Sequence, residues 1–162
     1  MKKLLSLVAI LLFASAAYAV DLTNWQMQQD GSRTTFDVVV PCTVAGALNQ
    51  AGFYGKRVFE ELRYFDLDKG LFDTPWVFTT KFAAEKGLHH VLRFEGVGYS
   101  ADIFLNGKQI AAADTTVGVF CIREYDVTRL IKKNNEIRVK VYKAPEESLN
   151  IGYVDWNPRP VD

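Results

Sequence analysis

Cysteine and histidine are scarce in this sequence, which has two of each among its 162 residues. His89 and His90 are adjacent, so on a strand their side chains point to opposite faces and cannot hold one ion. Cys42 and Cys121 lie far apart in the sequence, with no histidine beside either of them. We therefore expect no metal site. Whether Cys42 and Cys121 form a disulfide or stay as two separate thiols is left open by the sequence.

An excess of charge of either sign is also missing, since 19 lysines and arginines balance 19 aspartates and glutamates. Nucleic acid and anionic membranes are therefore not expected as partners, whereas neutral glycans remain open. The sequence lacks a G-x-S-x-G nucleophile elbow, a phosphate-binding glycine loop and an H-E-x-x-H motif. Carboxylate pairs at 60–61, 66–68 and 146–147 are more typical of solvated loops than of glycosidase acid pairs. We expect no catalytic residue and no cofactor.

The one long apolar run lies at the amino terminus and is too short to cross a membrane. Met1–Lys3 is positively charged, Leu4–Phe13 is mostly apolar, and Ala17–Ala19 has the A-x-A form of a cleavage site. This order predicts a secretory signal peptide over residues 1–19, with a buried N-terminal helix as the alternative. Cleavage leaves residues 20–162, enough for one domain. The protein is then exported, to a bacterial periplasm or beyond.

Alternation of apolar and polar residues predicts short strands along most of the remaining chain. Three strands gather such residues on one face: Trp76, Phe78, Thr80 and Phe82; Ala101, Ile103 and Leu105; and Ile137, Val139 and Val141. Further strands are expected over 36–40, 88–95, 109–112 and 118–123. Asn106–Gly107 predicts a tight hairpin turn, because both residues accept a positive φ.

Helical pattern is sparse along the chain. Thr43 can cap a short helix over residues 44–50 that stops at Gly52. A second helix of one or two turns is predicted within 126–135, capped by Asp126 or by the threonine two residues later. Neither is long enough to join parallel strands. The predicted fold class is all-β, an antiparallel sandwich or jelly roll with one or two short helices.

Four stretches occur in an order that points to a known family: VPCTV at 40–44, TPWVFTTKF at 74–82, LRFEGVGYSADIFLNG at 92–107 and YDVT at 125–128. Together they resemble the N-terminal sugar-binding domain of glycoside hydrolase family two, in which VPGTV, PWWYRTEF, LRFDGVNYRADVWLNG and DVT motifs recur. The stretch from 92 to 107 is the most specific. D-W-N-P at 155–158 is similar to the D-W-[GN]-P stretch of the β-mannosidase and exo-β-glucosaminidase branch.

This resemblance implies a galactose-binding-like jelly roll in which most motif residues are scaffold. Phe94, Tyr99, Ile103 and Leu105 would fill the core, Gly96 and Gly98 would mark a bend, and Trp25 would begin the domain as a packed aromatic. Enzymes of the family are retaining exo-glycosidases whose two catalytic glutamates lie on a downstream (β/α)₈ barrel. No catalytic residue is therefore expected in this chain. The family domain continues with further strands, so we expect residues 20–162 to be incomplete at the C-terminal end.

The resemblance also places three substrate-binding residues in the last loop. Asp155 would accept hydrogen bonds from sugar hydroxyls, and Trp156 would offer a flat apolar face to sugar C–H groups. Asn157 would donate to and accept from a neighbouring hydroxyl. The alternative is that Trp156 packs under the sandwich and Asp155 caps a turn.

The expected function is that of an N-terminal carbohydrate-binding domain of an exported retaining β-glycosidase. Its expected partners are a β-linked glycan and the catalytic barrel of the same polypeptide. A free-standing carbohydrate-binding module and a structural sandwich without sugar specificity are the alternatives. Tyr54, Tyr64 and Tyr142 are a second, weaker candidate surface for sugar.

Overall fold

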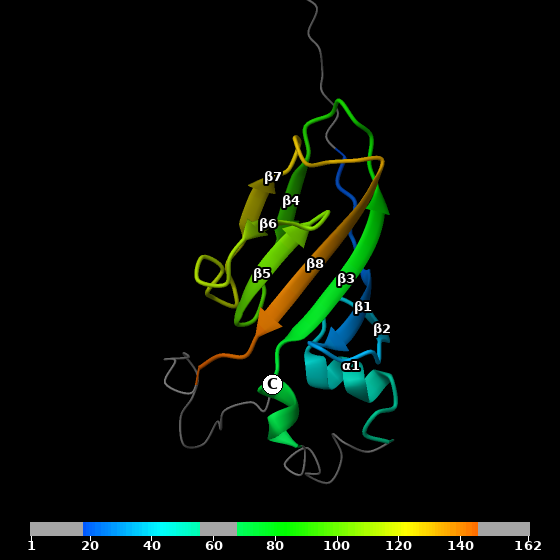
Figure 1. Cartoon of the computed structure of the whole chain (residues 1–162), viewed down its shortest axis with the longest axis vertical. Helices are drawn as coiled ribbons and strands as arrows, with labels where there is room; N and C mark the ends of the chain where they lie inside the picture. Colours follow the sequence, from blue (N-terminus) through cyan, green and yellow to red (C-terminus); the bar gives the residue numbers. More distant parts are fainter. Residues whose placement is uncertain (1–17, 56–67, 146–162) are drawn as a thin grey trace, which may run out of the picture.

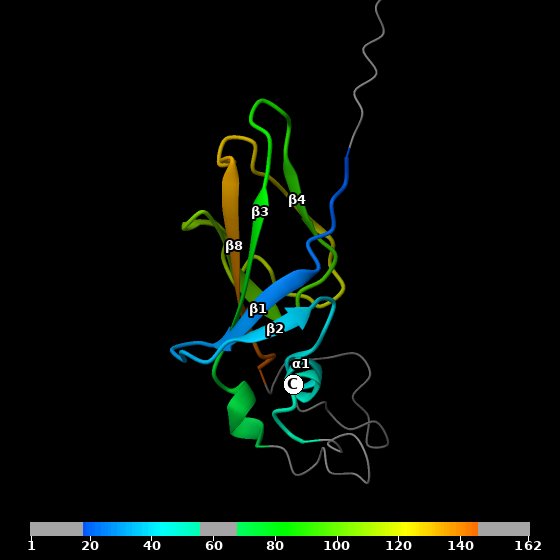
Figure 2. The same ribbon diagram turned by 90° about the vertical axis from the view of Figure 1, so that its right-hand side faces the viewer.

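The computed structural model describes residues 18–55 and 68–145, which form two antiparallel sheets packed in two layers (Figures 1 and 2). The larger sheet has the strand order β2-β1-β3-β8-β5-β6, and the smaller sheet is the pair β4-β7. The strands are β1 (Asn24–Gln29), β2 (Phe36–Val39), β3 (Trp76–Ala83), β4 (Val91–Phe94), β5 (Ser100–Leu105), β6 (Lys108–Ala111), β7 (Arg123–Asp126) and β8 (Asn134–Tyr142). The predicted fold class is confirmed.

The strands β3 and β8 form the centre of the larger sheet and pair along almost their whole length. Most residues expected on their inner faces are buried, namely Trp76, Phe78, Thr80, Ile137 and Val139, whereas Phe82 and Val141 are partly buried. The hydroxyl of Thr80 donates to the backbone carbonyl of Asn24 at 2.8 Å, so this polar group is paired inside the core. The predicted alternation therefore holds along β8, whereas β3 also buries Val77 on its other face.

The hairpin between β5 and β6 turns at Asn106–Gly107 as predicted, with φ values of 53° and 83°. The amide Nδ2 of Asn106 donates to the carbonyl of Leu130 at 3.0 Å and to Oδ1 of Asn135 at 2.9 Å. Its Oδ1 accepts from the backbone amide of Glu136 at 3.0 Å. The turn thus also anchors the start of β8. The inner face of β5 is fully buried, as expected for Ala101, Ile103 and Leu105.

The predicted first helix is α1 (Val44–Gln50), and Thr43 is its N-cap. Oγ1 of Thr43 accepts from the backbone amide of Gly46 at 3.0 Å, which satisfies a donor that the helix leaves unpaired. The residues of α1 that face the protein are buried: Ala45, Ala47 and Leu48. Across residues 18–55 and 68–145, no helix combines the length and the apolar character needed to span a membrane.

The second helix, predicted as one or two turns within 126–135, is reduced to a single turn that is too short to be assigned as a helix. After β7 the chain makes a single turn, in which the amide of Ile131 donates to the carbonyl of Val127. The carboxylate of Asp126 caps this turn. Strand β8 begins at Asn134, so pairing with β3 takes the residues that a further helical turn would need. A helix this short gains too little from its own hydrogen bonds to compete with the sheet.

The strand predicted over 118–123 is wrong, because only Arg123 belongs to β7. The guanidinium of Arg123 donates to the carbonyls of Val117 at 2.5 Å and Cys121 at 3.2 Å. Gly118 has a φ of 120°, which ends any extended run. This stretch therefore forms a loop folded around an arginine side chain.

The strand β1 was missed, since its sequence NWQMQQ is mostly polar. It pairs with β2 on one edge and with β3 on the other. Met27 is completely buried, and Trp25 packs against the core while its Nε1 donates to the carbonyl of Leu22. Trp25 is therefore the packed aromatic that was predicted. A short 3₁₀ helix, η2 (Lys69–Phe72), was not predicted.

Candidate functional site

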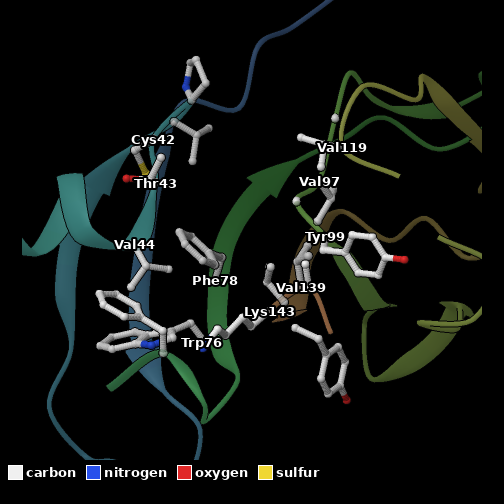
Figure 3. A pocket seen from close by; sticks show the side chains of 18 of the residues that line it. Cys42, Thr43, Val44, Trp76, Phe78, Val97, Tyr99, Val119, Val139 and Lys143 are labelled. Atoms are coloured by element: carbon white, nitrogen blue, oxygen red, sulfur yellow. The ribbon is translucent and has the colours of Figure 1, made fainter. Parts of the chain in front are cut away.

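A cleft of about 500 Å³ opens between the two layers, beside the first residues of α1 (Figure 3). Most of its lining is apolar. Figure 3 shows Cys42, Thr43 and Val44 on one side and Val97, Tyr99 and Val119 on the other, with Phe78 of β3 and Val139 of β8 between them. The cleft thus joins three of the four sequence stretches that carry the family resemblance.

The first wall of the cleft is the segment 40–44. Its Val40–Pro41 peptide is cis, and the segment leads directly into α1. Cys42 is partly buried, and desolvation raises the pKa of its thiol, which keeps it protonated at neutral pH. Cys42 and Cys121 are both free, so the structure contains two separate thiols in place of a disulfide.

The second wall is the predicted bend at 96–98, which lies directly against Val119. A Cβ on Gly96 would lie 2.4 Å from the carbonyl oxygen of Val119, so this position accepts no side chain. A Cβ on Gly98 would meet a methyl group of Val119 at 3.4 Å. The prediction that Tyr99 fills the core is wrong: Tyr99 is only partly buried and lines the cleft instead.

Two polar side chains of the cleft lining, Trp76 and Lys143, are engaged with other parts of the protein. The ring Nε1 of Trp76 donates to the carbonyl of Leu71 at 3.2 Å. At the edge, Nζ of Lys143 lies 2.9 Å from Oδ1 of Asp73. Among the described residues no carboxylate lines the cleft, so this part of the chain offers neither an acid/base nor a nucleophile for glycoside hydrolysis. The cleft suits an apolar contact surface.

The two adjacent histidines contact different groups. The Nε2 of His89 is 3.5 Å from a carboxylate oxygen of Asp126, whereas the Nε2 of His90 lies 2.6 Å from the carbonyl of Glu85. In the described ranges, 18–55 and 68–145, no three histidine, cysteine or acidic side chains gather in a way that could hold a metal ion. Both histidines lie before β4, so the prediction that a strand directs them to opposite faces does not apply, but their contacts do differ.

The three predicted substrate-binding residues, Asp155, Trp156 and Asn157, lie outside the described residues. The carboxylate pairs at 60–61 and 146–147 lie outside them as well. Of the remaining pair, Asp68 is described, and its Oδ1 accepts from the backbone amide of Gly70 at the start of η2. That contact is the loop role expected from sequence.

Two of the three tyrosines of the second candidate sugar surface, Tyr54 and Tyr142, are described, and their contacts differ. The hydroxyl of Tyr142 donates to Oδ2 of Asp102 at 2.6 Å, on the sheet face that also carries Lys140. Burial and this hydrogen bond raise the pKa of Tyr142, and the nearby ammonium of Lys140 opposes the shift. Tyr54 packs edge-to-face on Phe53 beside α1. Tyr64 lies outside the described residues.

The cleft itself was missed by sequence reasoning, which treated the residues around it as scaffold. A signal was present in the uncharged run from 117 to 122, interpreted as a strand, and in the glycines at 96 and 98. Neither signal says how far apart the two sheets stand, and that spacing decides whether a cleft exists.

Known proteins that are similar to this chain include enzymes that are much longer. An exo-β-D-glucosaminidase of Hypocrea jecorina is 42% identical over 130 residues, a match that covers 75% of this chain and 14% of the enzyme. The chain therefore spans about one seventh of the length of that relative.

Solved structures share the fold at lower identity. The exo-chitosanase of Amycolatopsis orientalis superposes with a TM-score of 0.78 at 22% identity, over 90% of this chain and 19% of that one. A β-D-mannosidase from Dictyoglomus thermophilum gives a TM-score of 0.67 at 23% identity, over 76% of this chain and 15% of that one. At these identities the likeness establishes the fold alone.

A family model described as the glycosyl hydrolase 2 galactose-binding domain-like domain matches residues 25–153. The matched range contains both sheets apart from Asn24, the first residue of β1, and it contains α1 and every wall of the cleft. The resemblance found in the sequence motifs is thereby confirmed: this chain belongs to the glycosyl hydrolase 2 galactose-binding domain-like family.

Proposed function

We propose that this chain is the N-terminal carbohydrate-binding domain of an exported retaining β-glycosidase of the exo-β-glucosaminidase or β-mannosidase type. The observation that carries the proposal is the family match over residues 25–153, together with 42% identity to an enzyme named as an exo-β-D-glucosaminidase. The proposal assigns the catalytic step to a barrel outside the matched segment, and it is supported by a match that covers only 14% of that enzyme. The lack of carboxylates in the described cleft supports this division of labour.

In this proposal the chain supplies one wall of the sugar pocket through Asp155, Trp156 and Asn157. A carboxylate accepts hydrogen bonds from sugar hydroxyls and also pairs with the ammonium group of a glucosamine unit. The indole of Trp156 covers the apolar face of the ring. Of the two sugar classes, β-linked glucosaminides are favoured, because the curated relatives that match the chain carry that name.

The test is a hybrid enzyme in which residues 20–162 replace the matched segment of the Hypocrea jecorina enzyme. We expect hydrolysis of nitrophenyl β-D-glucosaminide, and a loss of kcat/KM of roughly 10- to 100-fold in Asp155→Ala, the effect of removing a hydrogen bond to a charged group. Asp114→Ala is the matched control, since Asp114 is exposed in the loop after β6. Equal activities of the two variants would contradict the role of Asp155.

Binding experiments on the chain alone distinguish this proposal from a free-standing carbohydrate-binding module and from a structural sandwich. Calorimetry with chitosan oligosaccharides should give weak binding or none, because the other wall of the pocket is missing. Tight binding that is lost in Asp155→Ala would favour a free-standing carbohydrate-binding module. An inactive hybrid, together with no binding by the chain alone, would favour a structural sandwich.

Export is the remaining part of the proposal, and it rests on the A-x-A site at residues 17–19. Expression of the whole chain in a bacterium should give a secreted product whose first residue is Val20. Replacing Ala19 by arginine should leave the precursor uncut. Mass spectrometry of both products shows whether residues 1–19 have been removed. A secreted chain that still carries them would contradict the predicted cleavage site.

A further inference from the structure

The loop between β6 and β7 exposes an unusual run of apolar side chains. We call residues 117–122, with the sequence VGVFCI, the apolar loop. The exposed fractions are 95% for Phe120, 58% for Ile122, 44% for Val117 and 39% for Val119. Single exposed apolar residues are normal on protein surfaces, but four within six consecutive residues form a patch of the kind that marks an interaction site.

The backbone of the apolar loop is held by polar contacts, which leave its apolar side chains free. The guanidinium of Arg123 donates to the carbonyls of Val117, Gly118 and Cys121. The amide of Gly118 donates to the carbonyl of Tyr99 at 3.0 Å. A loop fixed in this way loses little conformational entropy when its side chains are covered, so it is preorganised for binding.

A charge-compensated rim lies beside the apolar loop. Nη1 of Arg93 is 3.1 Å from Oε1 of Glu124, and Nε of Arg93 is 3.5 Å from Oε1 of Glu95. The charge of Arg123 is directed into the loop backbone. An apolar centre beside paired charges is the usual arrangement of a protein–protein interface.

We propose that the apolar loop docks against an uncharged, apolar face of another domain of the same polypeptide. The proposal rests on the proposed function, because the matched relative extends far beyond the 14% of its length that this chain covers. The chemistry of the loop argues against other occupants. A glycan needs hydrogen-bonding side chains, which Phe120 and Ile122 lack, and an anionic membrane needs an unpaired basic rim.

The apolar loop is also continuous with the cleft, since Val119 belongs to both. The close approach of Val119 to Gly96 fixes the loop against the bend at the end of β4. A partner that covers Phe120 would therefore lie next to the mouth of the cleft and could fill it with its own apolar side chains. The docking surface is then the apolar loop together with the second wall of the cleft.

The test compares the hybrid enzyme with the chain alone, residues 20–162, by thermal unfolding. The double variant Phe120→Ser/Ile122→Ser should lower the Tm of the hybrid by about 4 °C or more, or split its transition in two. It should leave the Tm of the chain alone within about 1 °C, because exposed side chains contribute little there. Leu88→Ser is the matched control, as Leu88 is 52% exposed outside the apolar loop. Phe120→Leu, which stays apolar, should keep most of the coupling.

Three results would overturn the proposal. An equal fall of the Tm in the hybrid and in the chain alone would make the loop a structural part of this domain. No fall in either would mean that the loop docks on nothing. A dimer of the chain alone that Phe120→Ser dissociates would make the occupant a second copy. This measurement does not depend on activity. If the hybrid is inactive but its Tm still falls in the double variant, the proposed function is contradicted while the docking surface is supported.

Discussion

The two sheets differ in how completely they bury their side chains. On β5 the inner residues Ala101, Ile103 and Leu105 are fully buried, and β3 buries residues on both of its faces. No residue of β4 or β7 is fully buried: Leu92, Phe94 and Tyr125 pack against the core while remaining partly exposed. The smaller sheet therefore covers the larger one without sealing it, and the cleft lies where the cover is open.

This difference indicates where the stability of the domain resides. A two-stranded ribbon is marginal by itself, so β4 and β7 depend on the larger sheet for their order. Regions with few buried apolar contacts open at lower free energy than the core. We expect the smaller sheet to be the first part of the described structure to open, and the larger sheet to unfold with the whole domain.

The largest expected effect on stability comes from truncating one apolar side chain in each sheet and comparing the two losses. Ile103→Ala should lower the free energy of unfolding by about 3 kcal/mol, because it leaves a cavity in a fully buried site. Leu92→Ala, in the half-buried face of β4, should cost about 1 kcal/mol. Urea unfolding of both variants measures the difference. Equal costs would show that the smaller sheet is as integral to the core as the larger one.

An intermediate effect is expected at the β5–β6 turn of the larger sheet. Asn106→Ala loses three side-chain hydrogen bonds and puts an alanine at positive φ, which should cost about 2 kcal/mol. Asn106→Gly removes the bonds but tolerates the φ, so it separates the two contributions. Asn134→Ala, at an exposed position of β8, is the control and should cost little. An Asn106→Ala cost equal to that of the control would contradict the anchoring role of the turn.

The smallest effect is a pH dependence at the end of the smaller sheet. Hydrogen bonds from the hydroxyl and the amide of Thr128 lower the pKa of Asp126, and His89 adds a smaller contribution in the same direction. A carboxylate whose pKa is lowered on folding stabilises the protein above its unfolded pKa, and this stabilisation is lost as the pH falls through the folded pKa.

The measurement is a carbon-13 titration of Asp126 by NMR, joined to urea unfolding between pH 7 and pH 2. We expect the midpoint of Asp126 below its ordinary value of 3.8, and a small loss of stability in Asp126→Asn that disappears at the acid end. Asp114→Asn serves as the matched control for removing an exposed acidic charge. A normal or raised midpoint for Asp126 would contradict the capping contacts.

Local signals explain which parts of the fold could be predicted from the sequence. Thr43 capping α1 and Asn106–Gly107 turning between strands depend on contacts within a few residues, and both predictions are confirmed. The alternation along β5 and β8 was also sufficient, because each of these strands has one face against the core, whereas β3 also buries Val77 on its other face. The family resemblance rests on these same locally encoded stretches.

Long-range contacts explain the failures. Arg123 donates hydrogen bonds to backbone carbonyls of the segment before it and holds that segment as a loop. The pattern of apolar and polar residues does not indicate such bonds. β1 is a strand because it pairs on both edges, and its polar sequence gives no sign of that. The cleft depends on the spacing of two sheets. The predicted residues Asp155, Trp156 and Asn157 lie outside the described structure, so their role stays a prediction.

The position of β3 has a consequence for how fast this domain can fold. Its two neighbours are β1 and β8, and each is separated from it by roughly 50 residues of chain, so neither pairing is a local hairpin. Proteins dominated by such distant pairings fold in milliseconds to seconds, whereas helical bundles fold far faster. The β5–β6 hairpin can form early, but it has to wait for β3 and β8 before its apolar face is covered. During that interval the chain exposes strand edges, and this is the stage at which aggregation would compete with folding.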